Sequence, residues 1–233
     1  MNLATPKIYL ILGTENSGRR SILNDLLSDF PSKNKILYFK DVSNSPSEYD
    51  AKLESLPNLI KINFKVEECK IKHEPISDSP ESIFFISSEK CDPSDIIEGL
   101  KNWLNKNNCS LTRIITNADC RLIENNPFAE EWYNACIHFS DYVLVNNVGV
   151  NDTKWLNNWT KNQKQKFHPT RFETVKKNCV RNPADVLDST TYRNTQFFDY
   201  NDNEFLSDDF EEDKYIKRLQ NGDRELKIKR ILK

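Results

Sequence analysis

The stretch YLILGTENSGRRSILNDLL, residues 9–27, decides the fold class. An apolar run at residues 8–12 predicts a buried strand, and the residues after the glycine-bounded turn place their apolar side chains on one face of a helix. The same alternation continues along the chain. It predicts further strands at 35–40, 58–66, 82–87, 111–116, 141–147 and 171–176, and helices at 49–56, 95–106, 127–139, from 152 or 153 onward, and at 183–187. Ser94 is the expected N-cap of the helix that follows it. Strands alternating with helices predict an α/β protein with a mainly parallel sheet.

The turn in this stretch has the spacing of a phosphate-binding loop, G-x-x-x-x-G-K-[ST]. Gly13 and Gly18 are two of five glycines in the whole chain, and they lie between a predicted strand and a predicted helix, as the motif requires. In such a loop, successive backbone N–H groups point into one concavity at the positive end of the helix. The alternative is a tight strand-to-helix turn without a ligand, and the strand–turn–helix context favours the phosphate-binding loop.

Two positions of the motif are altered. Arg19 replaces the lysine that contacts the outer phosphates, and a planar guanidinium is no close substitute for an ammonium. Arg20 replaces the hydroxyl residue that binds magnesium, and its charge repels a divalent cation. Ser21 cannot take over, because one step along a helix turns a side chain by about 100°. The loop therefore predicts anion binding with a poor magnesium site, and slow or absent hydrolysis.

Composition and charge limit the classes of partner. The chain has 233 residues, 37% hydrophobic and 29% charged, and a formal net charge of −2, which gives no reason to expect nucleic acid or an anionic membrane as partner. The first apolar run is too short for a signal peptide or a membrane span. Six scattered cysteines contain no C-x-x-C pair, which predicts free thiols and a cytoplasmic location.

A change in composition near residue 198 suggests two parts. Residues 1–198 are predicted to form the α/β domain, and residues 199–233 a charged tail. In this tail the acidic run DYNDNEFLSDDFEED precedes the basic, helix-like run KYIKRLQNGDRELKIKRILK. A solvated appendage and a docking or self-association segment are both open interpretations of the tail.

Three stretches, taken in order, resemble the CobW-type metal-chaperone P-loop GTPases. GTENSGRRSILN at 13–24 is similar to that family's phosphate loop, with Leu23 and Asn24 also matching. SIFFISSEKCDPSDIIEGL at 82–100 is similar to a strand and helix of the family, with isoleucine at an acidic position and glutamate at a glycine position. The run at 114–147 is similar over a longer stretch, and its matching residues are Asp119, Pro127, Ala129, Asp141 and Asn146. The resemblance covers roughly residues 7 to 150 and implies a three-layer P-loop NTPase-like fold.

The departures from this family concern its chemistry. The guanine-reading motif N-K-x-D corresponds to residues 146–149, where Gly149 cannot supply the aspartate that accepts two hydrogen bonds from guanine. The family's C-x-C-C metal motif falls near EECKIKH, where Cys69 and His73 remain, and two ligands do not make a structural zinc site. We therefore expect no metal site, and no counterpart of the family's separate C-terminal domain.

The sequence thus predicts a degenerate P-loop protein without catalytic residues of its own. In this interpretation it binds a nucleotide (GTP or ATP) or another polyanion with weak or no hydrolysis, and Glu89 lies near the loop, where its charge opposes phosphate. The alternative is a pseudo-GTPase scaffold that acts through protein–protein contacts alone, and a third is an active NTPase that uses shifted residues. The predicted binding residues are Gly13, Asn16, Ser17, Gly18, Arg19, Arg20, Ser21 and Asn146.

Two other groups of residues are better explained by packing. His138 lies on the apolar face of its predicted helix. Trp155 and Trp159 lie four residues apart on a lysine-rich helix, and a half-buried helix with a solvated face explains them better than stacking of nucleic-acid bases.

Overall fold

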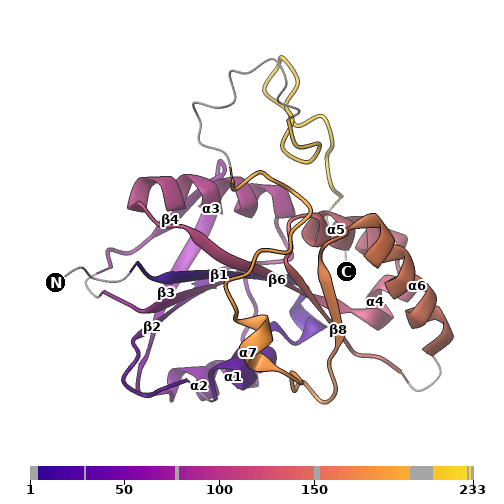
Figure 1. Cartoon of the computed structure of the whole chain (residues 1–233). Helices are drawn as coiled ribbons and strands as arrows, with labels where there is room; N and C mark the ends of the chain where they lie inside the picture. Colours follow the sequence, from indigo (N-terminus) through magenta and orange to yellow (C-terminus); the bar gives the residue numbers. More distant parts are fainter. Residues whose placement is uncertain are drawn as a thin grey trace.

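A twisted sheet of eight strands forms the middle layer of the computed structural model, which describes residues 5–28, 30–76, 79–149, 153–199, 212–229 and 231 (Figure 1). Within these residues the strand order is β4-β3-β2-β5-β1-β6-β7-β8. The strands are β1 (Lys7–Gly13), β2 (Ile36–Asp41), β3 (Leu59–Glu67), β4 (Lys70–His73), β5 (Ser82–Ile86), β6 (Leu111–Asp119), β7 (Tyr142–Asn146) and β8 (Arg171–Thr174). All neighbouring strands pair in parallel except β3 and β4, which form an antiparallel hairpin. The predicted α/β class with a mainly parallel sheet is confirmed.

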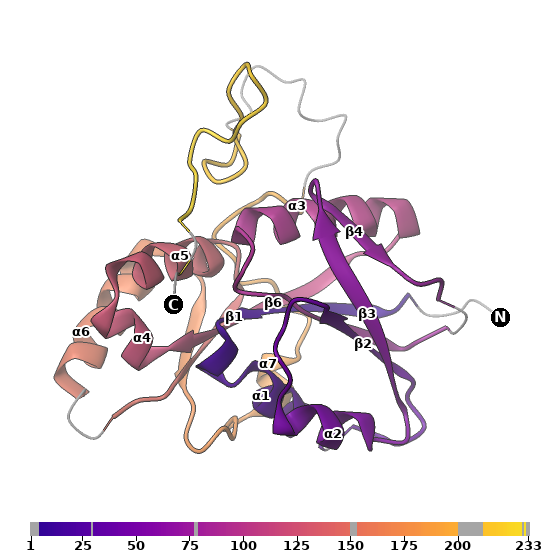
Figure 2. The same ribbon diagram turned by 180° about the vertical axis from the view of Figure 1, so that it is seen from behind.

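Helices cover both faces of the sheet (Figures 1 and 2). One face carries α3 (Pro93–Asn107), α5 (Pro127–His138) and α6 (Thr153–Lys166), and the other carries α1 (Arg19–Leu27), α2 (Glu48–Glu54) and α7 (Pro183–Val186). A short 3-10 helix, η1 (Glu15–Ser17), and α4 (Cys120–Asn125) follow the carboxyl ends of β1 and β6. Among the described residues, no helix combines the length and the apolar composition needed to cross a membrane.

The central strand β1 shows why its residues form a buried strand. Leu10 and Leu12 pack in the core under α3 and α5, whereas Tyr9 and Ile11 pack in the core under α1 and α2. Successive side chains of a strand point to opposite faces, so a strand covered on both sides reads as a continuous apolar run. The carboxyl ends of β1, β5, β6 and β7 meet at one edge of the sheet, where the loops after them lie close together.

Local signals explain where the sequence predictions of helices differ from the structure. Asp92, not Ser94, is the N-cap of α3: its side chain accepts a hydrogen bond from the Ser94 N–H at 2.8 Å, and Pro93 takes the first helical position. The basic run of the tail, which resembles a helix in sequence and could equally be partly flexible, contains turns and one bridged pair but no helix in its described residues 214–229. Gly222 has a φ of 85°, and the Asn-Gly pair there closes a hairpin turn, which interrupts the helical pattern.

The strand β4 lies at one edge of the sheet and was not predicted from the sequence. Its residues alternate between exposed lysines, Lys70 and Lys72, and half-buried side chains. The ammonium group of Lys72 pairs with Glu67 of β3 at 2.6 Å. With four residues and two charges, β4 carries too weak an apolar pattern to be distinguished from a loop.

Candidate functional site

The two glycines of the loop let the chain turn sharply between β1 and α1. Gly13 has a φ of 146° and Gly18 a φ of 85°, which residues with a side chain rarely adopt. There is also no room for a side chain at either position. A Cβ on Gly13 would lie 2.6 Å from the carbonyl oxygen of Asn117, and a Cβ on Gly18 would lie 2.6 Å from the amide nitrogen of Asn146. Glycine is therefore needed at both positions, and the loop packs closely against β6 and β7.

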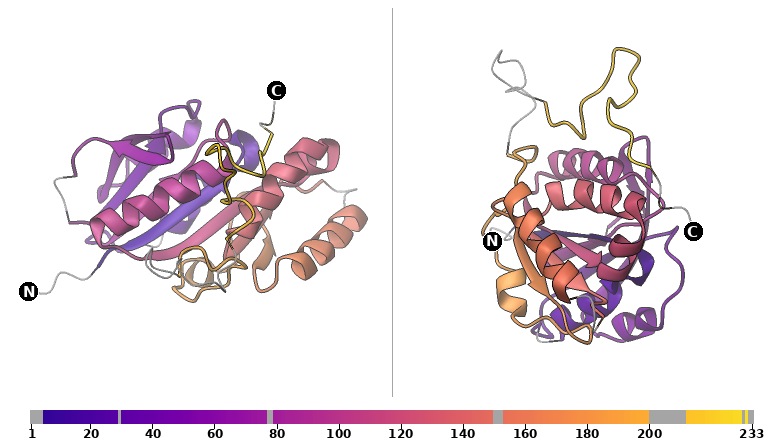
Figure 3. Two further views of the ribbon diagram at one scale, coloured as in Figure 1. Left: turned by 90° about the horizontal axis from the view of Figure 1, so that it is seen from above. Right: turned by 90° about the vertical axis from the view of Figure 1, so that its right-hand side faces the viewer.

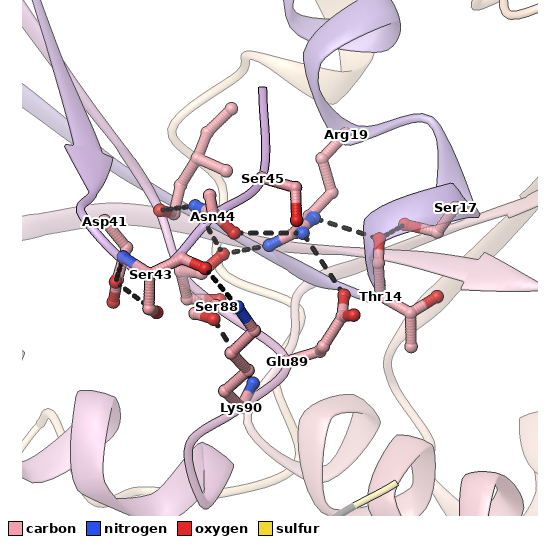
Figure 4. Close-up of polar contacts among 12 residues, drawn as sticks. Thr14, Ser17, Arg19, Asp41, Ser43, Asn44, Ser45, Ser88, Glu89 and Lys90 are labelled. Atoms are coloured by element: carbon pink, nitrogen blue, oxygen red, sulfur yellow. Dashed lines mark hydrogen bonds and ion pairs between the residues drawn. The ribbon is translucent and has the colours of Figure 1, made fainter. Parts of the chain in front are cut away.

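The side chain of Arg19 lies inside the site rather than pointing toward solvent (Figure 4). It is 2% exposed. Its Nε donates to the carbonyl oxygen of Thr14 at 3.0 Å, one terminal nitrogen donates to the carbonyl oxygen of Ser87, and the other donates to Asn44 Oδ1 at 3.3 Å. The guanidinium thus joins the loop between β1 and α1 to the loops that follow β2 and β5.

The carboxylate of Glu89 lies 3.6 Å from the guanidinium of Arg19. This places Glu89 beside the loop, as expected. Burial lowers the pKa of Arg19, and the nearby carboxylate of Glu89 acts in the opposite direction. An arginine remains charged in proteins, so the site already contains a compensated ion pair.

Arg20 is also engaged within the protein. Its guanidinium donates to both carboxylate oxygens of Asp50 at 3.0 Å and to the carbonyl oxygen of Ser45 at 2.7 Å. Lys40 contacts the same carboxylate at 2.7 Å. Burial raises the pKa of Asp50, but hydrogen bonds from Lys40, from the Ser47 N–H and from Arg20 outweigh it, and the net shift is downward. Arg20 therefore anchors the start of α2 and leaves no hydroxyl at the position where the motif binds magnesium. The residues present do not fit a magnesium ion.

The hydroxyls of the loop donate to the loop itself. Ser17 Oγ donates to the carbonyl oxygen of Thr14 at 2.8 Å, and Ser21 Oγ donates to the carbonyl oxygen of Gly18 at 2.8 Å. The Ser17 N–H donates to the same Thr14 oxygen at 3.2 Å. The carbonyl of Thr14 therefore collects three donors, from the Ser17 backbone, the Ser17 hydroxyl and Arg19.

Tyr133 of α5 fixes the start of the loop from the opposite side. Its hydroxyl accepts hydrogen bonds from the N–H groups of Thr14 at 3.2 Å and Asp119 at 3.1 Å, and lies 2.9 Å from Thr14 Oγ1. Because both lone pairs of the phenol oxygen accept, its proton is directed at Thr14 Oγ1. Burial raises the pKa of Tyr133. The backbone N–H of Thr14, like that of Ser17, thus donates to a group of the protein itself.

Two asparagine side chains tie the end of β7 to the loop. Asn146 Nδ2 donates to the carbonyl oxygen of Ser17 at 3.1 Å and to Asn178 Oδ1 at 2.7 Å. Asn147 Nδ2 donates to the carbonyl oxygen of Asn16 at 2.8 Å and to Asp119 Oδ2 at 2.8 Å. The structure therefore places Asn146 against the segment that contains the other seven predicted binding residues, and these hydrogen bonds fix the conformation of the loop.

Two cavities flank the loop. The larger, here named the loop cavity, has a volume of about 760 Å³, and the charged side chains in its wall are those of Glu15, Glu89, Asp119 and Arg121. The smaller has a volume of about 410 Å³ at the ends of β7 and β8 and is lined by residues 146–148 and 174–178. Among the described residues, three carboxylates and one guanidinium line the loop cavity, so this described part of its wall is acidic, which does not suit a phosphate.

Cys69 and His73 do not form a common site. His73 Nε2 accepts a hydrogen bond from Trp103 Nε1 at 2.9 Å, which turns the ring into the aromatic packing under α3. Cys69 instead lies beside Asp95 and Glu98 of α3. The Cys69 sulfur and one carboxylate oxygen from each of the two acidic residues lie within 4.8 Å of one another. This group is named the Cys69 cluster below.

Several residues of the site were not predicted from the sequence. They are partners that lie far along the chain: Asn44 and Ser87 for Arg19, Asp50 for Arg20, and Asn178 for Asn146. A sequence signal existed for Asp50 alone: Ser47 and Asp50 have the spacing of a capping box, which they form at the start of α2. Nothing in the local sequence identifies the other partners.

Comparison with solved structures identifies the architecture. A zinc(II)-bound triple mutant of the YjiA GTPase matches with a TM-score of 0.50 and 11% sequence identity, over 81% of this chain and 62% of that chain. The fold is that of a P-loop GTPase. The zinc(II)-bound YjiA GTPase from E. coli gives a TM-score of 0.47 at 10% identity, with the same coverage. This chain thus spans less than two thirds of the length of either GTPase. No protein-family model and no curated protein matches the sequence.

Proposed function

We propose that this chain is a pseudo-GTPase: it uses the P-loop GTPase fold to bind a partner molecule at the carboxyl edge of the sheet and does not transfer phosphoryl groups. The observation that carries this proposal is the position of Arg19, whose buried guanidinium contacts Thr14 of the loop together with Asn44, Ser87 and Glu89 of the loops that follow β2 and β5. The loop that binds phosphate in other proteins of this fold here binds the protein's own side chain.

The free energy needed to displace the Arg19 side chain from its partners supports this proposal. A hydrogen bond to a charged group contributes about 1.5–3 kcal/mol, and Arg19 makes three of them. A phosphate that displaced Arg19 would also face the carboxylate of Glu89 across a short distance. Both effects oppose binding of a nucleoside triphosphate. Without a magnesium ligand at Arg20, the charge that develops in phosphoryl transfer would not be neutralised.

Titration with fluorescent GTP and ATP analogues tests the proposal, with and without magnesium. We expect no saturable binding up to about 1 mM, which corresponds to a binding free energy of about −4 kcal/mol. The matched control is the double variant Arg19→Lys with Arg20→Thr, which restores the motif and is expected to bind at least about tenfold tighter than the native chain. Micromolar binding by the native chain, or magnesium-stimulated phosphate release, would contradict the proposal.

A second function is favoured by the smaller cavity, which lies beside the loop and carries Lys176 and Lys177 in its wall. In this alternative the chain retains a nucleotide or another polyanion without magnesium, and Arg19 leaves Glu89 to contact it. The two functions differ in one measurement. Retained binding predicts a magnesium-independent signal that Arg19→Ala abolishes, whereas the pseudo-GTPase predicts no signal in either protein.

A further inference from the structure

Residues 212–229 and 231, named the C-terminal segment, lie over the face of the molecule that carries α3 and α5 (Figures 1 and 3). The segment contains no helix or strand. Its residues Tyr215, Ile216 and Ile228 are nevertheless buried, and they belong to the same hydrophobic cluster as residues of α3 and α5. It is therefore docked on the domain. Contacts at three places hold it there.

The first place is the end of α5. The carboxylate of Asp213 lies 2.7 Å from His138 Nε2 and accepts hydrogen bonds from Thr195 Oγ1 at 2.5 Å and from the Tyr215 N–H at 3.0 Å. Burial raises the pKa of Asp213, but the contacts with His138 and the other hydrogen bonds outweigh burial and lower it. This contact fixes the start of the segment and explains why His138 is buried.

The second place is the Cys69 cluster, which receives two arginines from a small hairpin. The Glu225 N–H donates to Lys217 O at 2.9 Å and the Leu219 N–H donates to Asp223 O at 2.7 Å. These bonds set Arg218 and Arg224 side by side across the hairpin. An isolated hairpin is marginally stable in water, so its order depends on docking.

The arginines fill the Cys69 cluster. Arg224 is 8% exposed; it donates to Asp95 Oδ1 at 2.5 Å, to Glu98 and to Cys69 Sγ at 3.4 Å. Arg218 donates to Glu98 Oε2 at 2.7 Å and to the same sulfur at 3.4 Å. Burial, followed by the carboxylates of Glu98 and Asp95, raises the pKa of the Cys69 thiol to about 12, so the thiol is neutral at pH 7. The cluster is thus an anionic seat for two guanidinium groups.

The third place is the loop cavity. Lys229 lies 4.9 Å above the ring centre of Phe128 at the start of α5, and Ile231 forms part of the wall of the loop cavity. The segment therefore connects the Cys69 cluster to the cavity beside the loop. The Cys69 cluster and the cavity are thus contacted by residues of one segment, which are seven positions apart in the sequence.

We propose that the C-terminal segment is a strap, seated by Arg218 and Arg224 in the Cys69 cluster, that controls the access of a partner to the loop cavity. This inference rests on the proposed function, in which the carboxyl edge of the sheet receives the partner. The seat is polar and partly exposed, since Arg218 is 41% exposed and Asp95 is 39% exposed. Salt, or a competing arginine-rich segment of the partner, can therefore release the strap without unfolding the domain.

Amide hydrogen exchange of the full chain tests the seat. In Arg224→Gln, the amides of Ile216, Leu219 and Glu225 are expected to exchange at least tenfold faster than in the native protein, while amides of β1 remain protected. The matched control is Lys227→Gln, because Lys227 belongs to the same segment, is 70% exposed and pairs with Asp223 alone among the described residues. Equal exchange in the two variants would overturn the proposal.

A milder variant and a salt titration keep the test decisive if Arg224→Gln folds poorly. Arg218→Gln removes the more exposed of the two guanidinium groups that contact Glu98 and is expected to speed exchange of the same segment amides, with β1 unchanged. In the native protein, raising NaCl from about 0.05 to 1 M should speed exchange in the segment and leave β1 unchanged. Absence of both effects would contradict the seat.

Access to the loop cavity is measured with a reporter thiol. Leu122 is half-buried and lines the cavity, so Leu122→Cys can be followed by maleimide labelling with peptide-level mass spectrometry. We expect labelling at least fivefold faster when Arg224→Gln is added, and no change when Lys227→Gln is added. An unchanged rate in the presence of faster segment exchange would show that the segment does not control the cavity. Neither measurement uses a nucleotide, so its failure is distinguishable from failure of the proposed function.

Discussion

The molecule contains two pairs of arginines that occupy polar sites, and they differ in where their partners come from. Arg19 and Arg20 belong to the loop motif itself and face carboxylates on neighbouring loops. Arg218 and Arg224 belong to the C-terminal segment and reach carboxylates more than a hundred residues away in the sequence. In both places carboxylates of the protein itself hold the guanidinium groups.

The difference between the pairs is one of burial. The loop pair is enclosed: Arg19 is 2% exposed and Arg20 is 6% exposed. In the C-terminal pair, Arg224 is enclosed but Arg218 is 41% exposed. Removing one partner of a buried pair leaves a buried charge uncompensated and is costly, whereas an exposed pair contributes about 1 kcal/mol or less. The loop pair therefore belongs to the permanent structure, and the C-terminal pair is suited to release.

The largest expected effect is the loss of Arg19. Arg19→Ala removes three buried charge-assisted hydrogen bonds and the cation beside Glu89, and we expect the free energy of unfolding to fall by about 3–5 kcal/mol in urea denaturation. Arg121→Ala, an exposed arginine in the wall of the loop cavity, is the control and should change stability by less than about 0.5 kcal/mol. A loss below about 1 kcal/mol for Arg19→Ala would mean that the guanidinium is free to bind a ligand.

The next effect concerns Asp50. Asp50→Asn leaves Arg20 and Lys40 without their shared carboxylate, and we expect a loss of about 1–2 kcal/mol at pH 7, reduced because Asp50 remains 15% exposed. The folded-state pKa of Asp50 is lowered, so its stabilising effect is present above the ordinary pKa of the carboxyl, about 4, and disappears as pH falls through the folded-state value. Unfolding of native and variant proteins from pH 7 to 2.5 should therefore converge in acid. A constant difference would contradict this.

The smallest effect separates the two pairs by their response to salt. A double-mutant cycle on Arg218 and Glu98 should give a coupling of about 0.5–1 kcal/mol at low salt that falls toward zero at 1 M NaCl. The same cycle on Arg20 and Asp50 should keep most of its coupling. Equal salt dependence of the two cycles would remove the distinction between a permanent pair and a releasable pair.

The sequence predicts the fold through patterns that are local. Continuous apolar runs identify the buried strands, and the spacing of Gly13 and Gly18 identifies the loop, because both depend on neighbouring residues. The strand β4 and the short helix α4 lack such a pattern. The basic run of the tail looks helix-like in sequence, whereas Asn221 and Gly222 within it favour a hairpin turn.

The predicted site residues come together, but their roles could not be predicted. From the sequence, Arg19 and Arg20 read as charges available to an anion, because the motif positions that they occupy contact phosphate and magnesium in a phosphate-binding loop. Their partners Glu89 and Asp50 reach them through the packing of separate strands. Whether a charge faces a ligand or another residue is decided by these long-range contacts, which a single sequence does not contain.

The edge strand β4 has a consequence for the behaviour of the protein at high concentration. An open sheet edge is a template on which another copy can add its own edge, the first step toward fibrous aggregates. At β4, such an encounter would set Lys70 and Lys72 of one copy against the same lysines of the next. Glu67 partly compensates the charge of Lys72, but the remaining repulsion between the ammonium groups disfavours pairing of two copies along this edge.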